Sequence, residues 1–157
     1  MERSPVPDLG TAPIPKERYV SPQYKALEDQ RLWPKVWLLA GFESDLAEPG
    51  SYFTYEVGRD SVLVVRQADG GIAAFHNVCT HRGNRLVEPG RGRAGSFTCL
   101  FHAWRFGVDG SLERAVDAET FSQGCPSDEL GLRPVHCDQW AGFVFINLDP
   151  DAETLES

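Results

Sequence analysis

Two short segments of the chain concentrate side chains that bind metals. Cys79-Thr80-His81 places one residue between a thiol and an imidazole, and Cys99-Leu100-Phe101-His102 places two residues between the second such pair. Residues 82–98 separate the two segments. Because thiolates and imidazoles are the usual ligands of zinc and of iron–sulfur clusters, this pattern predicts a metal centre held by two loops.

Spacing distinguishes the two kinds of centre. Paired ligands in structural zinc sites usually have about two to four residues between them, so the single residue between Cys79 and His81 is tight for one zinc ion. A two-iron cluster lets the Cys and the His of each segment bind different irons, which is the Rieske arrangement of two Cys on one iron and two His on the other. The pattern favours a 2Fe-2S cluster held by Cys79, His81, Cys99 and His102, with a structural zinc module as the non-redox alternative.

The sequence around these ligands resembles the Rieske 2Fe-2S domain of non-haem iron oxygenases. The resemblance rests on residues 77–83 (NVCTHRG) and 99–104 (CLFHAW) and extends through 37–41, 49–53 and 142–148, so it covers roughly residues 18–150. That stretch is similar to the N-terminal part of the large (alpha) subunit of aromatic-ring-hydroxylating and related oxygenases. Respiratory Rieske proteins carry one more Cys in each segment, where this chain has Asn84 and Phe101. Stand-alone Rieske ferredoxins generally lack the leading helix.

The resemblance implies an electron-transfer role. The cluster would accept single electrons from a reductase or ferredoxin and pass them to a mononuclear Fe(II) in an oxygenase catalytic domain or a neighbouring subunit, as part of a monooxygenase or dioxygenase. Only His76 and His136 remain outside the cluster motif, and no paired-His-and-carboxylate segment is present. We therefore expect no catalytic residues and no complete oxygenase site in this chain, and mononuclear iron only in a catalytic half that it lacks. The alternative is a stand-alone Rieske ferredoxin-like carrier.

The elements that position the two segments are mostly strands. Short β-rich runs separated by turn residues predict an all-β Rieske fold, with short antiparallel strands in stacked sheets and a two-loop cluster-binding subdomain. The runs are 36–42, 51–57, 62–66, 72–77, 97–100, 104–108, 132–137 and 142–148. Asp69-Gly70-Gly71 and Asp109-Gly110 predict two hairpin turns. Ser21-Pro22 predicts the start of one N-terminal helix that ends near Trp33.

The same pattern divides the chain into three parts. Residues 1–17 contain Pro5, Pro7, Pro13 and Pro15 and are expected to form an extended arm. Residues 18–150 form the Rieske domain, and 151–157 form an acidic tail or a truncated linker.

The composition of the chain restricts the kinds of partner that it can bind. The 157 residues carry a net charge of -8, which argues against nucleic acid and anionic membranes as partners. The longest apolar stretches fall well short of the roughly 20 residues that span a bilayer, and no secretory signal is readable, so we expect a cytoplasmic protein without a membrane segment.

Several further residues have two interpretations each. The segment from residue 82 to residue 105 contains five arginines and only one acidic residue, Glu88. This segment is either a solvated loop or a docking surface for an acidic electron donor or for the next subunit. The arginines are Arg82, Arg85, Arg91, Arg93 and Arg105. Trp104 and Phe106 either shield the cluster or form ordinary core. Gly83, Gly107 and Gly110 either allow the backbone to approach the sulfides of the cluster closely or serve as turn residues. Cys125 and Cys137 are expected to be free thiols, one in a loop and one in the core.

Overall fold

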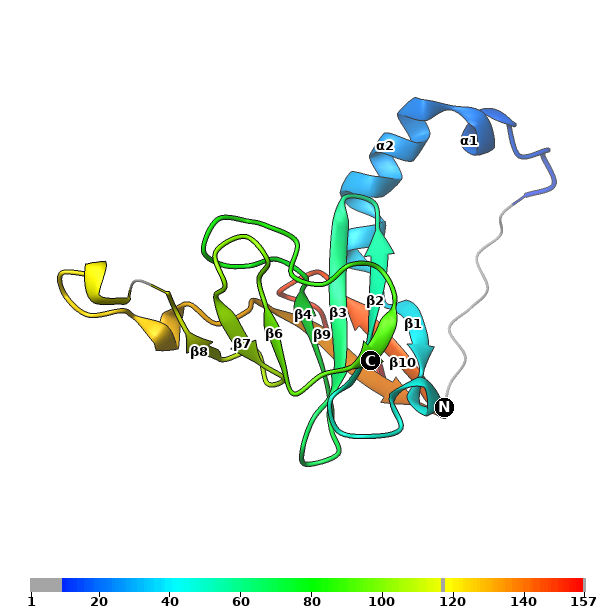
Figure 1. Cartoon of the computed structure of the whole chain (residues 1–157). Coiled ribbons are helices and arrows are strands. Elements are labelled where there is room, and N and C mark those ends of the chain that lie inside the picture. Colours follow the sequence, from blue (N-terminus) through cyan, green and yellow to red (C-terminus); the bar gives the residue numbers. More distant parts are fainter. Residues whose placement is uncertain (1–9, 117, 157) are drawn as a thin grey trace.

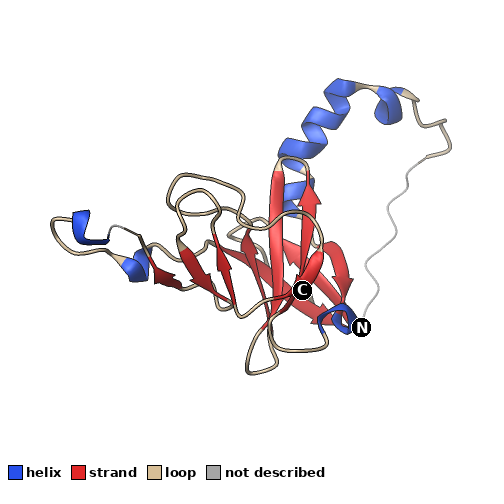
Figure 2. Ribbon diagram, in the orientation of Figure 1, coloured by secondary structure: helices blue, strands red, loops and turns tan. Residues whose placement is uncertain are grey.

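The fold is given by a computed structural model, which describes residues 10–116 and 118–156 (Figure 1). Residues 1–9 of the expected arm and Ser157 of the expected tail lie outside the described residues, and residues 10–16 are exposed and form no helix or strand. Strands make up most of the regular structure (Figure 2). The all-β Rieske architecture of stacked antiparallel sheets is confirmed.

Ten strands form two sheets in the described part of the chain. The larger sheet has the order β1-β10-β9-β4-β3-β2-β5, and the smaller has the order β6-β7-β8. The strands are β1 (Leu38–Phe42), β2 (Ser51–Val57), β3 (Asp60–Arg66), β4 (Ile72–His76), β5 (Arg91–Arg93), β6 (Ser96–Thr98), β7 (Arg105–Gly107), β8 (Leu112–Arg114), β9 (Pro134–Trp140) and β10 (Phe143–Asn147). All of the strand pairs are antiparallel.

The side chains of β3 contribute to both of the apolar clusters that make up the core. Successive side chains point to opposite faces of a strand, so Val62 and Val64 pack into one apolar cluster while Leu63 and Val65 pack into the other. All four are fully buried. The cluster around Leu63 also contains side chains from β6, β7 and β8, so the large sheet holds the small, ligand-bearing sheet in place by apolar burial.

The helical segment is more divided than the sequence predicts. α2 (Pro22–Arg31) begins at the expected Ser21-Pro22, but it ends at Arg31 because Pro34 opens a separate 3-10 turn, η1 (Trp33–Lys35). One further helical turn, α1 (Glu17–Val20), precedes it. Both helices extend away from the sheets and bury none of their side chains (Figure 1). None of the described helices is long and apolar enough to cross a bilayer.

Strand bounds differ from the expected ones in places where apolar patterning is weak. β5 was not predicted because Arg91-Gly92-Arg93 contains no apolar side chain; it forms as an exposed edge strand on β2. β8 was missed because it follows the Asp109-Gly110 turn with one apolar residue, Leu112. The three short remaining 3-10 turns are η2 (Glu43–Leu46), η3 (Ala118–Thr120) and η4 (Ser127–Glu129).

Candidate metal centre

The four predicted ligands lie on two loops that leave the sheets. Cys79 and His81 follow β4, and Cys99 and His102 connect β6 to β7. Both cysteines are only 2% exposed, whereas both histidines are partly exposed. The sulfur ligands are therefore enclosed by protein, and the imidazoles lie toward the solvent.

The first loop closes in a tight turn around Cys79. The Cys79 N–H donates to the carbonyl oxygen of Asn84 at 2.8 Å, and the Gly83 N–H donates to the carbonyl oxygen of Cys79 at 2.9 Å. Gly83 has a φ of +72°, and a β-carbon there would meet nothing within 4 Å. Gly83 is therefore a turn residue whose backbone conformation favours glycine.

The second loop repeats this turn although its ligand spacing differs. The Cys99 N–H donates to the carbonyl oxygen of Trp104 at 2.8 Å, and the Ala103 N–H donates to the carbonyl oxygen of Cys99 at 2.9 Å. Ala103 takes the place of the first loop's glycine, with a φ of +54°. Both cysteines thus precede the same kind of turn, and the turn residue is the fourth after each cysteine.

The loops bring like ligands together. The Cys79 and Cys99 side chains lie within hydrogen-bonding reach of each other. The rings of His81 and His102 lie edge to face with centroids 4.8 Å apart. The His81 ring also stacks on Trp104, at 4.7 Å and an interplanar angle of 13°. Two thiols on one side and two imidazoles on the other form the donor set that a Rieske cluster requires.

Backbone N–H groups surround the two sulfur atoms and oppose the effect of burial. Burial and the neighbouring Cys99 thiol raise the pKa of the Cys79 thiol above its ordinary value, although the N–H groups of His81 and Arg82 act to lower it. At Cys99 burial also acts to raise the pKa, but the N–H groups of Phe101 and His102 together with the Cys79 thiol and the Asn84 amide bring the pKa below its ordinary value. These donors are arranged for negatively charged sulfur, the form of cysteine that binds iron.

Two neighbouring side chains tune the ligands further. The Asn84 amide nitrogen lies 3.8 Å from Cys99 Sγ and contributes to the lowered pKa of that thiol. Desolvation lowers the pKa of His81, and the nearby His102 and Arg82 add to the effect. A lowered pKa keeps His81 neutral, as a metal ligand must be. Trp104 is 3% exposed and belongs to the core, as one of its two interpretations predicts, and its ring also stacks on His81.

Any other grouping of metal-binding side chains would have to include the remaining histidines and acids. Within residues 10–116 and 118–156, no three His, Cys, Asp or Glu side chains converge as ligands of a single ion. A tetrahedral zinc ion needs such convergence, whereas each iron of a 2Fe-2S cluster takes two protein ligands. His136 Nε2 lies 3.0 Å from the carbonyl oxygen of Pro150, and His136 and His76 both line one hollow.

Sequence reasoning assigned no role to the residues that anchor the first loop. Asn77 is fully buried, and its side chain bonds both backbone groups of Val87: Nδ2 donates to the carbonyl oxygen at 2.6 Å and Oδ1 accepts from the N–H at 2.9 Å. Asn77 Nδ2 also donates to Ser61 Oγ at 3.0 Å. Thr80 Oγ1 donates to the carbonyl oxygen of Leu130 at 2.6 Å. The available signal for Asn77 was a polar residue that directly follows β4 and precedes the first ligand segment.

The basic character expected between residues 82 and 105 is largely cancelled by the fold. The structure pairs three of the five arginines with acids from elsewhere in the chain. These ion pairs are Arg85–Glu56 at 2.9 Å, Arg91–Asp45 at 2.9 Å and Arg105–Glu113 at 2.8 Å. Counting charges along the sequence missed these partners because Glu56, Asp45 and Glu113 lie outside the counted segment.

The other residues with two interpretations are also placed. Cys125 and Cys137 are free thiols that pack against different apolar clusters. Phe106 is fully buried core. A β-carbon on Gly107 would lie 2.5 Å from Asp109 Oδ1, so Gly107 is needed for close packing against the residues of its own turn. Gly110 combines a φ of +81° with close contact to the Phe75 ring.

Comparison with known proteins agrees with this geometry. The family model described as "Rieske [2Fe-2S] domain" matches residues 36–124, so the chain belongs to the Rieske domain family, whose domains bind a 2Fe-2S cluster. Its relatives are large subunits of Rieske oxygenases, as the sequence resemblance predicted.

Curated relatives include two monooxygenases. The chain is 39% identical to the chloroplastic choline monooxygenase of Spinacia oleracea over 88% of its own length and 31% of that protein. It is 38% identical to the carnitine monooxygenase oxygenase subunit of Escherichia coli K12, over 91% of its own length and 38% of that protein. The chain therefore spans about a third of the length of the curated relatives that it matches.

Solved structures give the same result. A quaternary ammonium Rieske monooxygenase, CntA, in complex with L-carnitine superposes with a TM-score of 0.82 and 36% identity, over 90% of this chain and 40% of that one. A naphthalene 1,2-dioxygenase variant superposes with a TM-score of 0.81 and 33% identity, over 88% of this chain and 31% of that one.

Proposed function

We propose that Cys79 and Cys99 bind one iron of a Rieske 2Fe-2S cluster and that His81 and His102 bind the other. The observation that carries this assignment is the pairing of like ligands: the two thiols are in contact, and the two imidazole rings lie 4.8 Å apart. The donor set fits the group, because each sulfur is buried and faces backbone N–H donors.

We further propose that the chain is the electron-accepting module of an oxygenase large subunit. When bound, a 2Fe-2S cluster accepts and releases one electron at a time. The chain's own residues set the direction of transfer. Cys79 and Cys99 are enclosed, whereas His102 lies at the loop tip beside Leu100 and Phe101, which are 88% and 60% exposed. This exposed apolar tip suits contact with the catalytic domain or a neighbouring subunit that holds the mononuclear iron.

Exposed apolar side chains favour the oxygenase module over an independent carrier. α1 and α2 lie outside the matched residues 36–124, and Tyr19, Val20 and Leu27 on them are exposed. Phe42 and Trp140 add exposed aromatic rings on the large sheet. Soluble carriers rarely expose so much apolar surface, whereas an oxygenase subunit would bury it against its remaining domain.

The relatives also bear on the substrate of the complete oxygenase. Identity is 38–39% with the choline and carnitine monooxygenases above and 33% with the naphthalene dioxygenase. We infer that the complete oxygenase is a monooxygenase that acts on a quaternary ammonium compound, in preference to an aromatic-ring dioxygenase. Its partners would be a reductase or ferredoxin and neighbouring oxygenase subunits. Two free thiols fit a reducing compartment such as the cytoplasm.

The ligand assignment is tested by reconstituting the purified chain with iron and sulfide and measuring both elements, the visible spectrum and the electron paramagnetic resonance of the reduced protein. Cys79→Ser and Cys99→Ser should lose the cluster, whereas Cys125→Ser and His136→Ala are matched controls that should keep it. A colourless protein with one zinc ion and no acid-labile sulfide would overturn the assignment in favour of the zinc module.

A further inference from the structure

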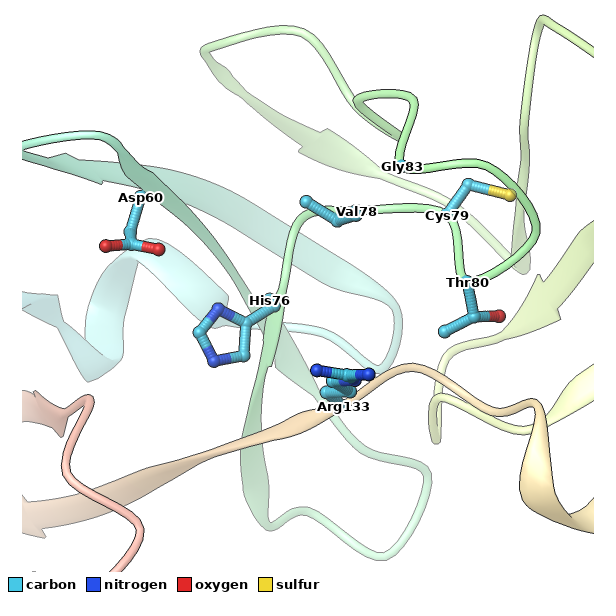
Figure 3. Close-up of a pocket in the computed structure, with 7 residues that line it drawn as sticks. All are labelled: Asp60, His76, Val78, Cys79, Thr80, Gly83 and Arg133. Atoms are coloured by element: carbon cyan, nitrogen blue, oxygen red, sulfur yellow. The ribbon is translucent and has the colours of Figure 1, made fainter.

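A groove lies against the outer side of the first ligand loop. It has a volume of 460 Å³, and Asp60, His76, Thr80 and Arg133 line it together with Cys79. Figure 3 shows the Arg133 guanidinium between His76 and Thr80, below the backbone of Val78 and Cys79. Cys79 Sγ points away from Arg133, and Cys79 itself lines the groove, so the groove directly adjoins a ligand residue of the cluster.

The walls of the groove are fixed in place by hydrogen bonds. The His76 N–H donates to the carbonyl oxygen of Arg133 at 2.9 Å, which ties β4 to the residue before β9. On the other side, Thr80 Oγ1 donates to the carbonyl oxygen of Leu130 at 2.6 Å. A partner would therefore meet a groove that is already formed, and little ordering would be needed on binding.

Arg133 is the cation that remains available in this groove. Its side chain is exposed and has no ion pair or hydrogen bond with any of the residues that the structure describes. Arg85, Arg91 and Arg105, by contrast, are neutralised by Glu56, Asp45 and Glu113. An adjoining hollow that shares Asp60, His76 and Val78 adds Arg59, which is likewise unpaired within the described residues.

We propose that this groove is the docking site of an acidic electron-donor protein, which places a carboxylate on Arg133. The inference rests on the electron-transfer function proposed above. With a net charge of -8 the chain as a whole repels an acidic donor, so encounter must be directed to an unpaired cation next to the cluster. One electron leaves the donor and enters the cluster from the Cys79 side, while the His81–His102 side stays free to face the mononuclear iron.

The test is the second-order rate of reduction of the reconstituted chain by an acidic plant-type 2Fe-2S ferredoxin, whose potential lies below the Rieske range. Arg133→Glu should lower this rate about tenfold at low ionic strength, and Arg133→Gln should lower it less. At 1 M salt the difference should fall to less than about twofold, because charges are screened beyond about 3 Å. Arg91→Glu makes the same change in net charge away from the groove and is the matched control.

The outcomes separate this inference from the proposed function. If Arg133→Glu keeps its visible spectrum and its rate with dithionite but is slow with the ferredoxin, the docking site is supported. Equal slowing by Arg91→Glu would show a general charge effect and overturn the site, and a larger effect of Arg82→Glu would move docking to the histidine side. Loss of the cluster in Cys79→Ser is independent of all three results, and its retention would instead contradict the ligand assignment.

Discussion

The side chain of Asn77 is predicted to hold the first ligand loop closed, and replacing it tests how the site is positioned. Asn77→Leu keeps the approximate size of the side chain and removes three hydrogen bonds, two to the backbone of Val87 and one to Ser61 Oγ. Residues 78–86, which include Cys79 and His81, lie between the two residues that this side chain joins.

The magnitude depends on the groups left without partners. An unsatisfied buried backbone group costs about 1–3 kcal/mol, so the N–H and the carbonyl of Val87 together lose about 2–6 kcal/mol. Val87 is only partly buried, and the leucine gains apolar burial, which reduces the net loss in the free energy of unfolding to roughly 2–4 kcal/mol. For a domain of this size that corresponds to a fall in Tm of about 5–15 °C.

Thermal melting should be monitored with two probes, far-ultraviolet circular dichroism for the sheets and visible absorption for the cluster. Asn77→Leu should lose the visible absorption at a lower temperature than the sheet signal, because the loop opens first. Asn147 is the matched control: it is also buried, on β10, and its side chain accepts one hydrogen bond, from the Asp149 N–H at 3.0 Å. Asn147→Leu should lower both transitions together and by less. Identical behaviour of the two variants would refute the proposed role of the Asn77 side chain in holding the first ligand loop closed.

Three further predictions concern single residues. Ala103→Gly should raise Tm by up to about 6 °C, since relief of a φ of +54° gains about 1–2 kcal/mol and the extra freedom of the unfolded chain takes back about 0.4–1 kcal/mol; a lower Tm would contradict the strain. Asn84→Ala should lower the reduction potential by roughly 20 mV, the equivalent of a weak hydrogen bond of about 0.5 kcal/mol that favours the more negative, reduced cluster, whereas an unchanged potential in a redox titration would show that the 3.8 Å contact has no effect. Burial raises the pKa of the Cys137 thiol to about 12. The contribution of the buried neutral thiol to the free energy of unfolding is therefore complete below pH 9 and is lost as the pH rises toward 12. The alkylation rate of Cys137 in the native protein should keep rising about tenfold per pH unit well beyond pH 9. A plateau in that rate near pH 9 would show an unburied thiol.

Local sequence patterns predicted most of the fold and all four candidate ligands. The alternation in β3 and the turn at Gly70 depend on neighbours in sequence, so the strand and hairpin were predictable. The two ligand segments could be recognised because the residue types and the spacing that bind iron are themselves local. Family membership confirms the Rieske prediction, while the four ligands remain a prediction for the mutants above to test.

The features that the sequence did not predict depend on contacts between residues that are distant in the chain. Arg85 lies beside Glu56 only because β2 and the first loop are adjacent in space, so a count along the chain overstated the positive charge. The same holds for β5, whose polar residues are strand only by virtue of pairing with β2. Arg133 lies 54 residues beyond Cys79 in sequence, and β9 brings it beside the loop.

The shared turn explains why two segments with different spacing can form one centre. In each loop the fourth residue after the cysteine has a positive φ and donates its N–H back to the cysteine carbonyl oxygen. The turn folds the N–H groups of the second and third residues after each cysteine over its sulfur, so the two sulfur atoms receive backbone donors from equivalent positions whichever residue carries the histidine. The extra residue before His102 changes only where the imidazole leaves the turn, and His81, one position earlier, stacks on Trp104 instead. The backbone donors to the two sulfur atoms are thus set by the shared turn geometry, whereas the positions of the two imidazoles are set by side-chain packing and are therefore more open to change by mutation.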